Sequence, residues 1–144
     1  MQSLSDSLFQ IIDPALQKYI DMPPGEGKSV VYAIVNMNDS KAYVGKHCHG
    51  IGGDSMRSTR LSIFLNPSAN DTSYKANAVR KHGKAAFAPF IIWHGDTCDE
   101  NVQEIFWISP DGLHTIKDDG GWGYNSRGGG EGGAFSASVI AKLK

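Results

Sequence analysis

Two tyrosines and one glutamate are the residues of this chain whose types could carry chemistry on a phosphodiester. Tyr32 and Tyr43 lie on two strand-like runs joined by a turn, and paired strands can bring both phenols to one surface. Glu104 lies among apolar neighbours, where an ionised carboxylate is costly unless it is solvated, paired or bound to a metal. Phosphodiester hydrolysis requires an aligned water, cations beside the phosphate and a carboxylate that can hold a hard metal ion. The chain contains residue types for all three.

The elements that must position these residues begin with a hairpin. Residues 29–35 are β-branched and apolar, residues 36–40 supply turn chemistry, and residues 42–45 resume a strand. Residues 87–93 are predicted as a third strand, in which Pro89 indicates an edge position or a strand that begins after it. We therefore predict an α/β fold of the α+β kind, with a small three-stranded sheet, mixed or antiparallel, flanked by helices.

Three helices are predicted around the sheet. The first covers residues 55–65, whose apolar positions line one side. The second begins in cap fashion at Asp71 and stops at Gly83, a residue that suits a left-handed helix end. The third opens with the capping-box pattern of Thr97 and Glu100.

Length and composition indicate one domain preceded by an arm. At 144 residues the chain has the usual size of a single domain. Residues 1–27 carry apolar residues at helical spacing, include the helix start Asp13-Pro14, and end in a proline- and glycine-rich linker. We predict that this amphipathic arm precedes a core of residues 28–144. Its apolar face either covers the sheet of its own subunit or forms a homodimer contact.

Charge and hydropathy limit the partners. The net charge is -1, so any phosphate-binding surface must be a local cluster of lysine and arginine. No apolar run is long enough for a membrane span, and the N-terminus lacks the pattern of a signal peptide. We therefore expect a soluble, cytoplasmic protein with no membrane contact.

The cysteines give little support for a disulfide or a metal centre. Cys48 and Cys98 are far apart and are expected as reduced thiols. His47, Cys48 and His49 are potential zinc ligands, but adjacent residues on a strand point to opposite faces. A zinc-binding interaction domain is therefore kept only as an alternative.

The hairpin resembles the opening of the GIY-YIG nuclease family, in which two tyrosines occur at this separation. Val30 stands where the family has its first glycine. The segments that carry the likeness, in the family's order, are Val30-Val31-Tyr32, Tyr43-Val44-Gly45, the glutamate helix from Glu104 to Ile108, and Gly123-Tyr124-Asn125. The resemblance covers roughly residues 30–133.

The resemblance implies a catalytic role for several of these residues. Glu104 would bind one divalent cation, Mg²⁺ or Mn²⁺, in contact with the phosphate. Tyr43, together with Tyr32, would position or deprotonate the attacking water. Because a phenol has a pKa of about 10, nearby positive charge must make a phenolate accessible, and Lys46 is the expected source. His47 is either an alternative base or a hydrogen-bonded structural residue.

The remaining site residues follow from the same resemblance. The family's phosphate-clamping arginine belongs on the first helix of the domain, where Arg57 is the first choice and Arg60 the second. Asn125 would fix the active-site backbone or the glutamate by hydrogen bonds. Arg127 would either contact a phosphate or lie exposed.

Together, the residues and the resemblance predict a metal-dependent endonuclease, a phosphodiester hydrolase of phage or homing type acting on double-stranded DNA. The alternative is a non-catalytic module that binds nucleic acid or protein on the same scaffold. The low net charge favours that alternative.

Overall fold

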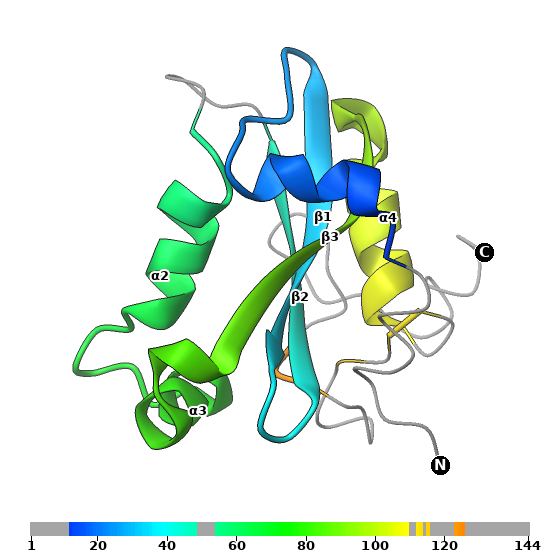
Figure 1. Cartoon of the computed structure of the whole chain (residues 1–144). Helices are drawn as coiled ribbons and strands as arrows, with labels where there is room; N and C mark the ends of the chain where they lie inside the picture. Colours follow the sequence, from blue (N-terminus) through cyan, green and yellow to red (C-terminus); the bar gives the residue numbers. More distant parts are fainter. Residues whose placement is uncertain (1–11, 49–53, 110–111, 114, 116–122, 126–144) are drawn as a thin grey trace.

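A three-stranded antiparallel sheet forms the centre of the computed structural model (Figure 1). Its strands are β1 (Lys28–Asn36), β2 (Lys41–Cys48) and β3 (Phe87–Asp96), in the order β2-β1-β3. The structure describes residues 12–48, 54–109, 112–113, 115 and 123–125. The predicted α+β fold is confirmed, and the sheet is antiparallel rather than mixed.

Short helices surround the sheet. They are η1 (Pro14–Ile20), η2 (Arg57–Leu61), α2 (Ser62–Leu65), α3 (Tyr74–His82), η3 (Lys84–Ala86), η4 (Thr97–Asp99) and α4 (Glu100–Ile108). In the part of the chain that the structure describes, no helix combines the length and the apolar character that crossing a bilayer would require.

The hairpin turn between β1 and β2 is closed by its own side chains. The Asn36 Oδ1 accepts a hydrogen bond from the Asn38 amide at 2.9 Å, and the Asp39 Oδ1 accepts one from the Lys41 amide at 3.0 Å. Ser40 adopts a positive φ of 62°. The expected turn over residues 36–40 is confirmed, because short polar side chains there satisfy backbone groups that the strands cannot.

The two faces of the sheet build separate apolar clusters, because side chains alternate along the central strand. Val30, Tyr32 and Ile34 of β1 pack with η2, α2 and α3. The intervening Val31, Ala33 and Val35 pack on the opposite face, with Ile108 of α4. Figure 1 shows α2 and α3 on one side of the strands and α4 on the other.

The described part of the arm lies on its own sheet. Asp13 caps η1 by accepting a hydrogen bond from the Ala15 amide at 2.9 Å, and Pro14 starts the helix, as predicted. The Gln17 side-chain amide pairs with Ile91 of β3, donating to its carbonyl at 2.8 Å and accepting from its amide at 2.9 Å. Residues 14–20 therefore cover an edge of their own sheet; residues 1–11 lie outside the described residues, and dimerisation stays a prediction.

Two helix starts differ from the sequence prediction. α3 begins after Ser73, whose hydroxyl accepts from the Ala76 amide at 3.3 Å, rather than after Asp71. The capping box of Thr97 and Glu100 is wrong, because Thr97 begins the separate turn η4 and Glu100 is already the first residue of α4. Pro89, by contrast, lies in the edge strand β3, as predicted.

Candidate active site

Tyr32 and Tyr43 lie on the same face of the hairpin. Tyr32 pairs with Gly45 and Ile34 pairs with Tyr43, so the two tyrosines are diagonal neighbours across β1 and β2. A Cβ atom at Gly45 would come within 2.5 Å of the Tyr32 Cζ. Glycine is thus required at this position, because the Tyr32 ring lies directly against its backbone.

Both phenols line one cavity of about 260 Å³ between the hairpin and the helices η2, α2 and α3. Tyr32 is 4% exposed and Tyr43 is half-buried, with its ring 5.4 Å from that of Phe64. The other lining residues are Arg60, Ile63, Phe64, Asn66, Pro67, Ser68, Asp71, Lys75 and Ala76. The cavity combines two hydroxyls with a guanidinium and an ammonium group, which are suitable partners for a phosphate.

The arginine at this cavity is Arg60 and not Arg57, the first choice from the sequence. Arg57 is exposed and donates a hydrogen bond from its Nε to the Asp21 carboxylate. Arg57 and Arg60 lie in the same π-helical turn, in which the Leu61 amide donates a hydrogen bond to the Met56 carbonyl at 2.9 Å. Residues three apart share a face in an α-helix, but a wider turn separates them. The two arginines therefore point to different partners.

Glu104 is close enough to act electrostatically on both phenols. It lies in α4 and is 8% exposed. After burial, its carboxylate is a further cause of the raised pKa of Tyr43 and of Tyr32. Because α4 covers the opposite face of the sheet, Glu104 acts on the two phenols by its charge and is not among the residues that line the cavity.

Burial keeps both phenols neutral. It is the largest cause of the raised pKa of Tyr32 and of Tyr43, and the positive charge of Arg60 opposes it at both. An ordinary phenol already has a pKa of about 10. At neutral pH each tyrosine is therefore a hydroxyl that can donate and accept a hydrogen bond, not a phenolate.

Lys46, the expected source of positive charge, lies on the other face of β2. It pairs with Val31, whose side chain belongs to the α4 face, and its Nζ donates to the Asn101 Oδ1 of α4. The structure therefore does not bring Lys46 to the phenols; Arg60 takes the place that was expected for it.

His47 shares the face of the tyrosines but is absent from the residues that line the cavity. It is 6% exposed, and its Nε2 contacts the Asp54 carbonyl at 2.7 Å. A carbonyl only accepts, so Nε2 carries the proton of the neutral ring. Burial lowers the pKa of this imidazole. These contacts agree with the second of the two alternatives for His47, a hydrogen-bonded structural residue.

Asn125 holds the outer edge of β2 directly after Tyr43. Its Oδ1 accepts from the Val44 amide and its Nδ2 donates to the Val44 carbonyl, both at 2.8 Å. The Thr115 hydroxyl also donates to that Oδ1, at 2.7 Å. Asn125 was expected to hydrogen-bond either the active-site backbone or the glutamate, and the structure has the bonds to the backbone. The side-chain amide thus bonds both backbone groups of Val44, as one residue of a neighbouring strand would.

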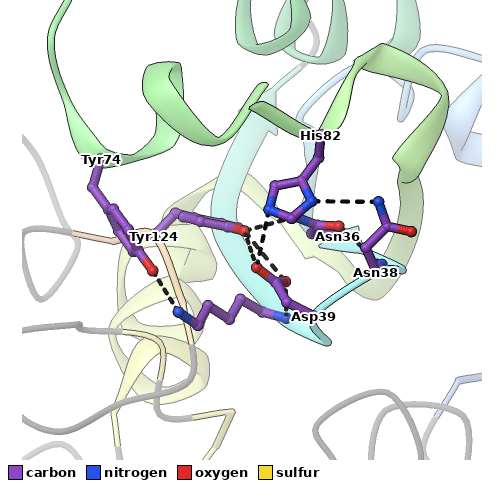
Figure 2. Close-up of polar contacts among 7 residues, drawn as sticks. Asn36, Asn38, Asp39, Tyr74, His82 and Tyr124 are labelled. Atoms are coloured by element: carbon purple, nitrogen blue, oxygen red, sulfur yellow. Dashed lines mark hydrogen bonds and ion pairs between the residues drawn. The ribbon is translucent and has the colours of Figure 1, made fainter. Parts of the chain in front are cut away.

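A polar network anchors the neighbouring Tyr124 to the hairpin turn (Figure 2). The Tyr124 hydroxyl accepts from the Asn36 Nδ2 and donates to the Asp39 Oδ2, each at 3.0 Å. Asp39 also lies 3.7 Å from the Nε2 of His82 at the end of α3. The network fixes the segment that presents Asn125, and it joins the hairpin, α3 and residues 123–125.

Two features of the cavity were missed by the sequence prediction. One is Lys75, whose Nζ lies 4.7 Å from the centroid of the Tyr43 ring. The other is the loop of residues 66–71, which forms one wall. Arg80 of α3 fixes that wall by donating to the carbonyls of Asp71 at 2.6 Å and Ser68 at 2.8 Å. Neither feature has a sequence signal, because both depend on how α3 meets the hairpin.

The possible metal ligands are few in the described residues. Glu104 and Glu100 are buried carboxylates one turn apart on α4, and the Glu100 Oε2 has no hydrogen-bond partner there. Within the same residues, no three histidine, cysteine or acidic side chains gather as a metal site. Mg²⁺ commonly takes one or two carboxylates and completes its shell with water and phosphate, which Glu104 would suit. His49 of the zinc alternative and Arg127 lie outside the described residues.

No protein-family model, curated protein sequence or solved structure matches this chain.

Proposed function

We propose that this chain is a metal-dependent DNA endonuclease of the GIY-YIG type. The observation that supports the proposal is the meeting of Tyr32, Tyr43 and Arg60 at one cavity, with the Glu104 charge acting on both phenols. The three cavity groups come from the hairpin and η2, whereas Glu104 comes from α4 and is not among the residues that line the cavity. Two phenols and a guanidinium at one cavity are what hydrolysis of a phosphodiester by an oriented water would need at the phosphate.

Arg60 would clamp the scissile phosphate. Its side chain is exposed at the cavity, and its planar guanidinium matches two phosphate oxygens. Glu104 would hold one Mg²⁺ or Mn²⁺. When bound, such a cation supplies positive charge to the phosphate and the leaving oxygen.

Tyr43 would orient the attacking water as a neutral phenol. Its oxygen can accept a hydrogen bond from the water while its own O–H donates a hydrogen bond to a phosphate oxygen. Tyr32, which is more deeply buried, would hold Tyr43 and the water in place. The raised pKa of both groups supports positioning over proton abstraction.

Double-stranded DNA would approach across η2 and α3. From Ser55 to Gly95 the only acidic residue is Asp71, whereas the basic residues are Arg57, Arg60, Lys75, Arg80, Lys81 and Lys84. This is the local basic cluster that a chain of low net charge needs for phosphate contacts. A cytoplasmic location would give access to DNA, and a homodimer through residues 1–27 would let two sites act on two strands.

Cleavage of supercoiled plasmid in Mg²⁺ tests the proposal. Glu104→Gln is expected to lower the rate about 10³-fold and Arg60→Gln about 10²-fold, because charge developing on the phosphate loses its partner. Tyr43→Phe is expected to lower it about 10²-fold. Lys18→Gln and Tyr19→Phe, outside both the cavity and the basic segment from Ser55 to Gly95, are controls and should cleave like the unmodified protein. Equal cleavage by Glu104→Gln and the unmodified protein would refute the assignment.

The pH dependence of cleavage separates the two roles of Tyr43. If the phenol is neutral and only positions water, Tyr43→Phe cleaves more slowly but keeps the same slope of log rate against pH between pH 6 and 9. If a phenolate were the base, the rate of the unmodified protein would rise with pH toward the raised phenol pKa, and Tyr43→Phe would lose that rise. Single-turnover rates at fixed ionic strength provide the measurement.

A non-catalytic nucleic-acid-binding module is the second candidate. It is favoured by the position of Lys46, which leaves the phenols without the lysine that the resemblance implies. This candidate predicts DNA binding that Arg60→Gln weakens, with no cleavage in any divalent cation.

A further inference from the structure

We propose that Lys75 binds a second phosphate of the DNA strand, adjacent to the phosphate at Arg60. This inference rests on the proposed function and adds a binding position to it. The cavity of about 260 Å³ lies just below the usual range of about 300–1,000 Å³ for drug-sized ligands. It suits a portion of a backbone, such as one phosphate and its sugar, better than a complete small molecule.

The charges that line the cavity make Lys75 necessary for anion binding. The charged side chains among its lining residues are Arg60, Lys75 and Asp71. Asp71 is held ionised, since a hydrogen bond from the Ser73 amide, at 2.9 Å, lowers the pKa of its carboxyl. Without Lys75, the guanidinium and the carboxylate would cancel, and the walls would carry no net positive charge for a second phosphate.

Lys75 is presented to the cavity by a fixed wall. Its helix, α3, is tied to the loop of residues 66–71 through the two Arg80 hydrogen bonds, and Lys84 donates to the Asn66 Oδ1 at 2.5 Å. Meanwhile the Lys75 ammonium lies over the Tyr43 ring. A cation over an aromatic face in a half-exposed site is weakly held, so a phosphate can draw it away without breaking a salt bridge.

The same contact places Lys75 next to the reacting groups. Arg60 and Lys75 come from different helices, and Tyr43 lies at the cavity with both. A strand bound by both cations would therefore lie at the cavity that Tyr43 lines. Lys75 would contribute to substrate binding, while Arg60 and Tyr43 act at the bond that breaks.

The test is DNA binding by fluorescence anisotropy over a range of salt, without divalent cation, using a labelled duplex. Lys75→Gln is expected to lower affinity and to reduce the slope of log affinity against log salt by about 1, because one phosphate contact is lost. Lys75→Arg should keep the slope. Lys18→Gln, an exposed lysine of η1 outside both the cavity lining and the basic segment from Ser55 to Gly95, is the control and should keep it too. Asp71→Asn should tighten binding.

Cleavage kinetics complete the test. Lys75→Gln is expected to raise KM and leave kcat at saturating DNA unchanged. An unchanged salt slope, or a fall in kcat with KM unchanged, would overturn the inference, the latter by assigning Lys75 to the positioning of Tyr43. Cleavage by the unmodified protein together with a silent Lys75→Gln would refute this inference alone. Absence of DNA binding by the unmodified protein would refute the proposed function as well.

Discussion

Each edge strand of the sheet is covered by a side-chain amide, which is buried at one edge and half-buried at the other. At the β2 edge the Asn125 amide pairs with Val44, directly after Tyr43; at the β3 edge the Gln17 amide pairs with Ile91, the strand partner of Tyr32. Each amide both donates to and accepts from one strand residue, as a neighbouring strand would.

The difference between the edges is their access to solvent. Asn125 is 6% exposed and receives a further hydrogen bond from Thr115, whereas Gln17 lies half-buried on the surface helix η1. Water can replace a lost partner at the β3 edge more readily than at the β2 edge. The comparison teaches that the same side-chain amide pairing can be a buried structural support at one edge and a partly exposed cover at the other.

The largest expected effect comes from breaking the β2 edge. Asn125→Ala leaves the amide and carbonyl of fully buried Val44 without partners, and each such group costs about 1–3 kcal/mol. We therefore expect a loss of about 2–6 kcal/mol in the free energy of unfolding, measured by urea denaturation. Cleavage should also fall, because the β2 backbone at Tyr43 loses its support. A loss below that of Gln17→Ala would contradict the comparison.

A smaller effect is expected where β2 packs against the Tyr32 side chain of the central strand β1. Gly45→Ala forces the Tyr32 ring away from β2, an overpacking that costs about 1–3 kcal/mol. Thermal and urea unfolding provide the measurement. Adding Tyr32→Leu, which removes the atoms that clash, should recover part of the stability. If the double variant were as unstable as the sum of the two single variants, Tyr32 would not be the residue that requires glycine there.

The smallest effect is expected at the β3 edge. Gln17→Ala removes two hydrogen bonds to Ile91 and one to the Asp13 carbonyl at a half-buried site, and we expect a loss of about 1 kcal/mol in the free energy of unfolding. Lys18→Ala, an exposed neighbour in η1, is the control and should change stability by less than about 0.5 kcal/mol. A loss equal to that of Asn125→Ala would show that burial does not separate the two edges.

Local chemistry explains which parts of the fold the sequence predicts. The hairpin follows from β-branched runs around polar turn residues, and Pro89 indicates an edge because it lacks the amide that a central strand must donate. The strand period of two also predicts that Tyr43, Gly45 and His47 share a face. The same period turns Lys46 away, so the reason for its absence from the cavity is already present in the sequence.

Other features depend on contacts that no local pattern contains. The choice between Arg57 and Arg60 follows from a π-helical turn, for which the residues 57–61 carry no known signal. Gln17 and Asn125 find their partners far along the chain, at Ile91 and Val44. Side-chain amides occur throughout surface positions, so their role at a sheet edge becomes visible only when the strands are placed.

The order of the two edge covers along the chain has a consequence for synthesis. Gln17 leaves the ribosome before β1, β2 and β3, so the cover for β3 already exists when that strand emerges. The outer edge of β2, complete at Cys48, must wait for Asn125, a delay of roughly 4–15 s at about 5–20 residues per second. During that interval β2 can pair with β1 on one side only, and its outer edge is open to strands of neighbouring nascent chains on the polysome.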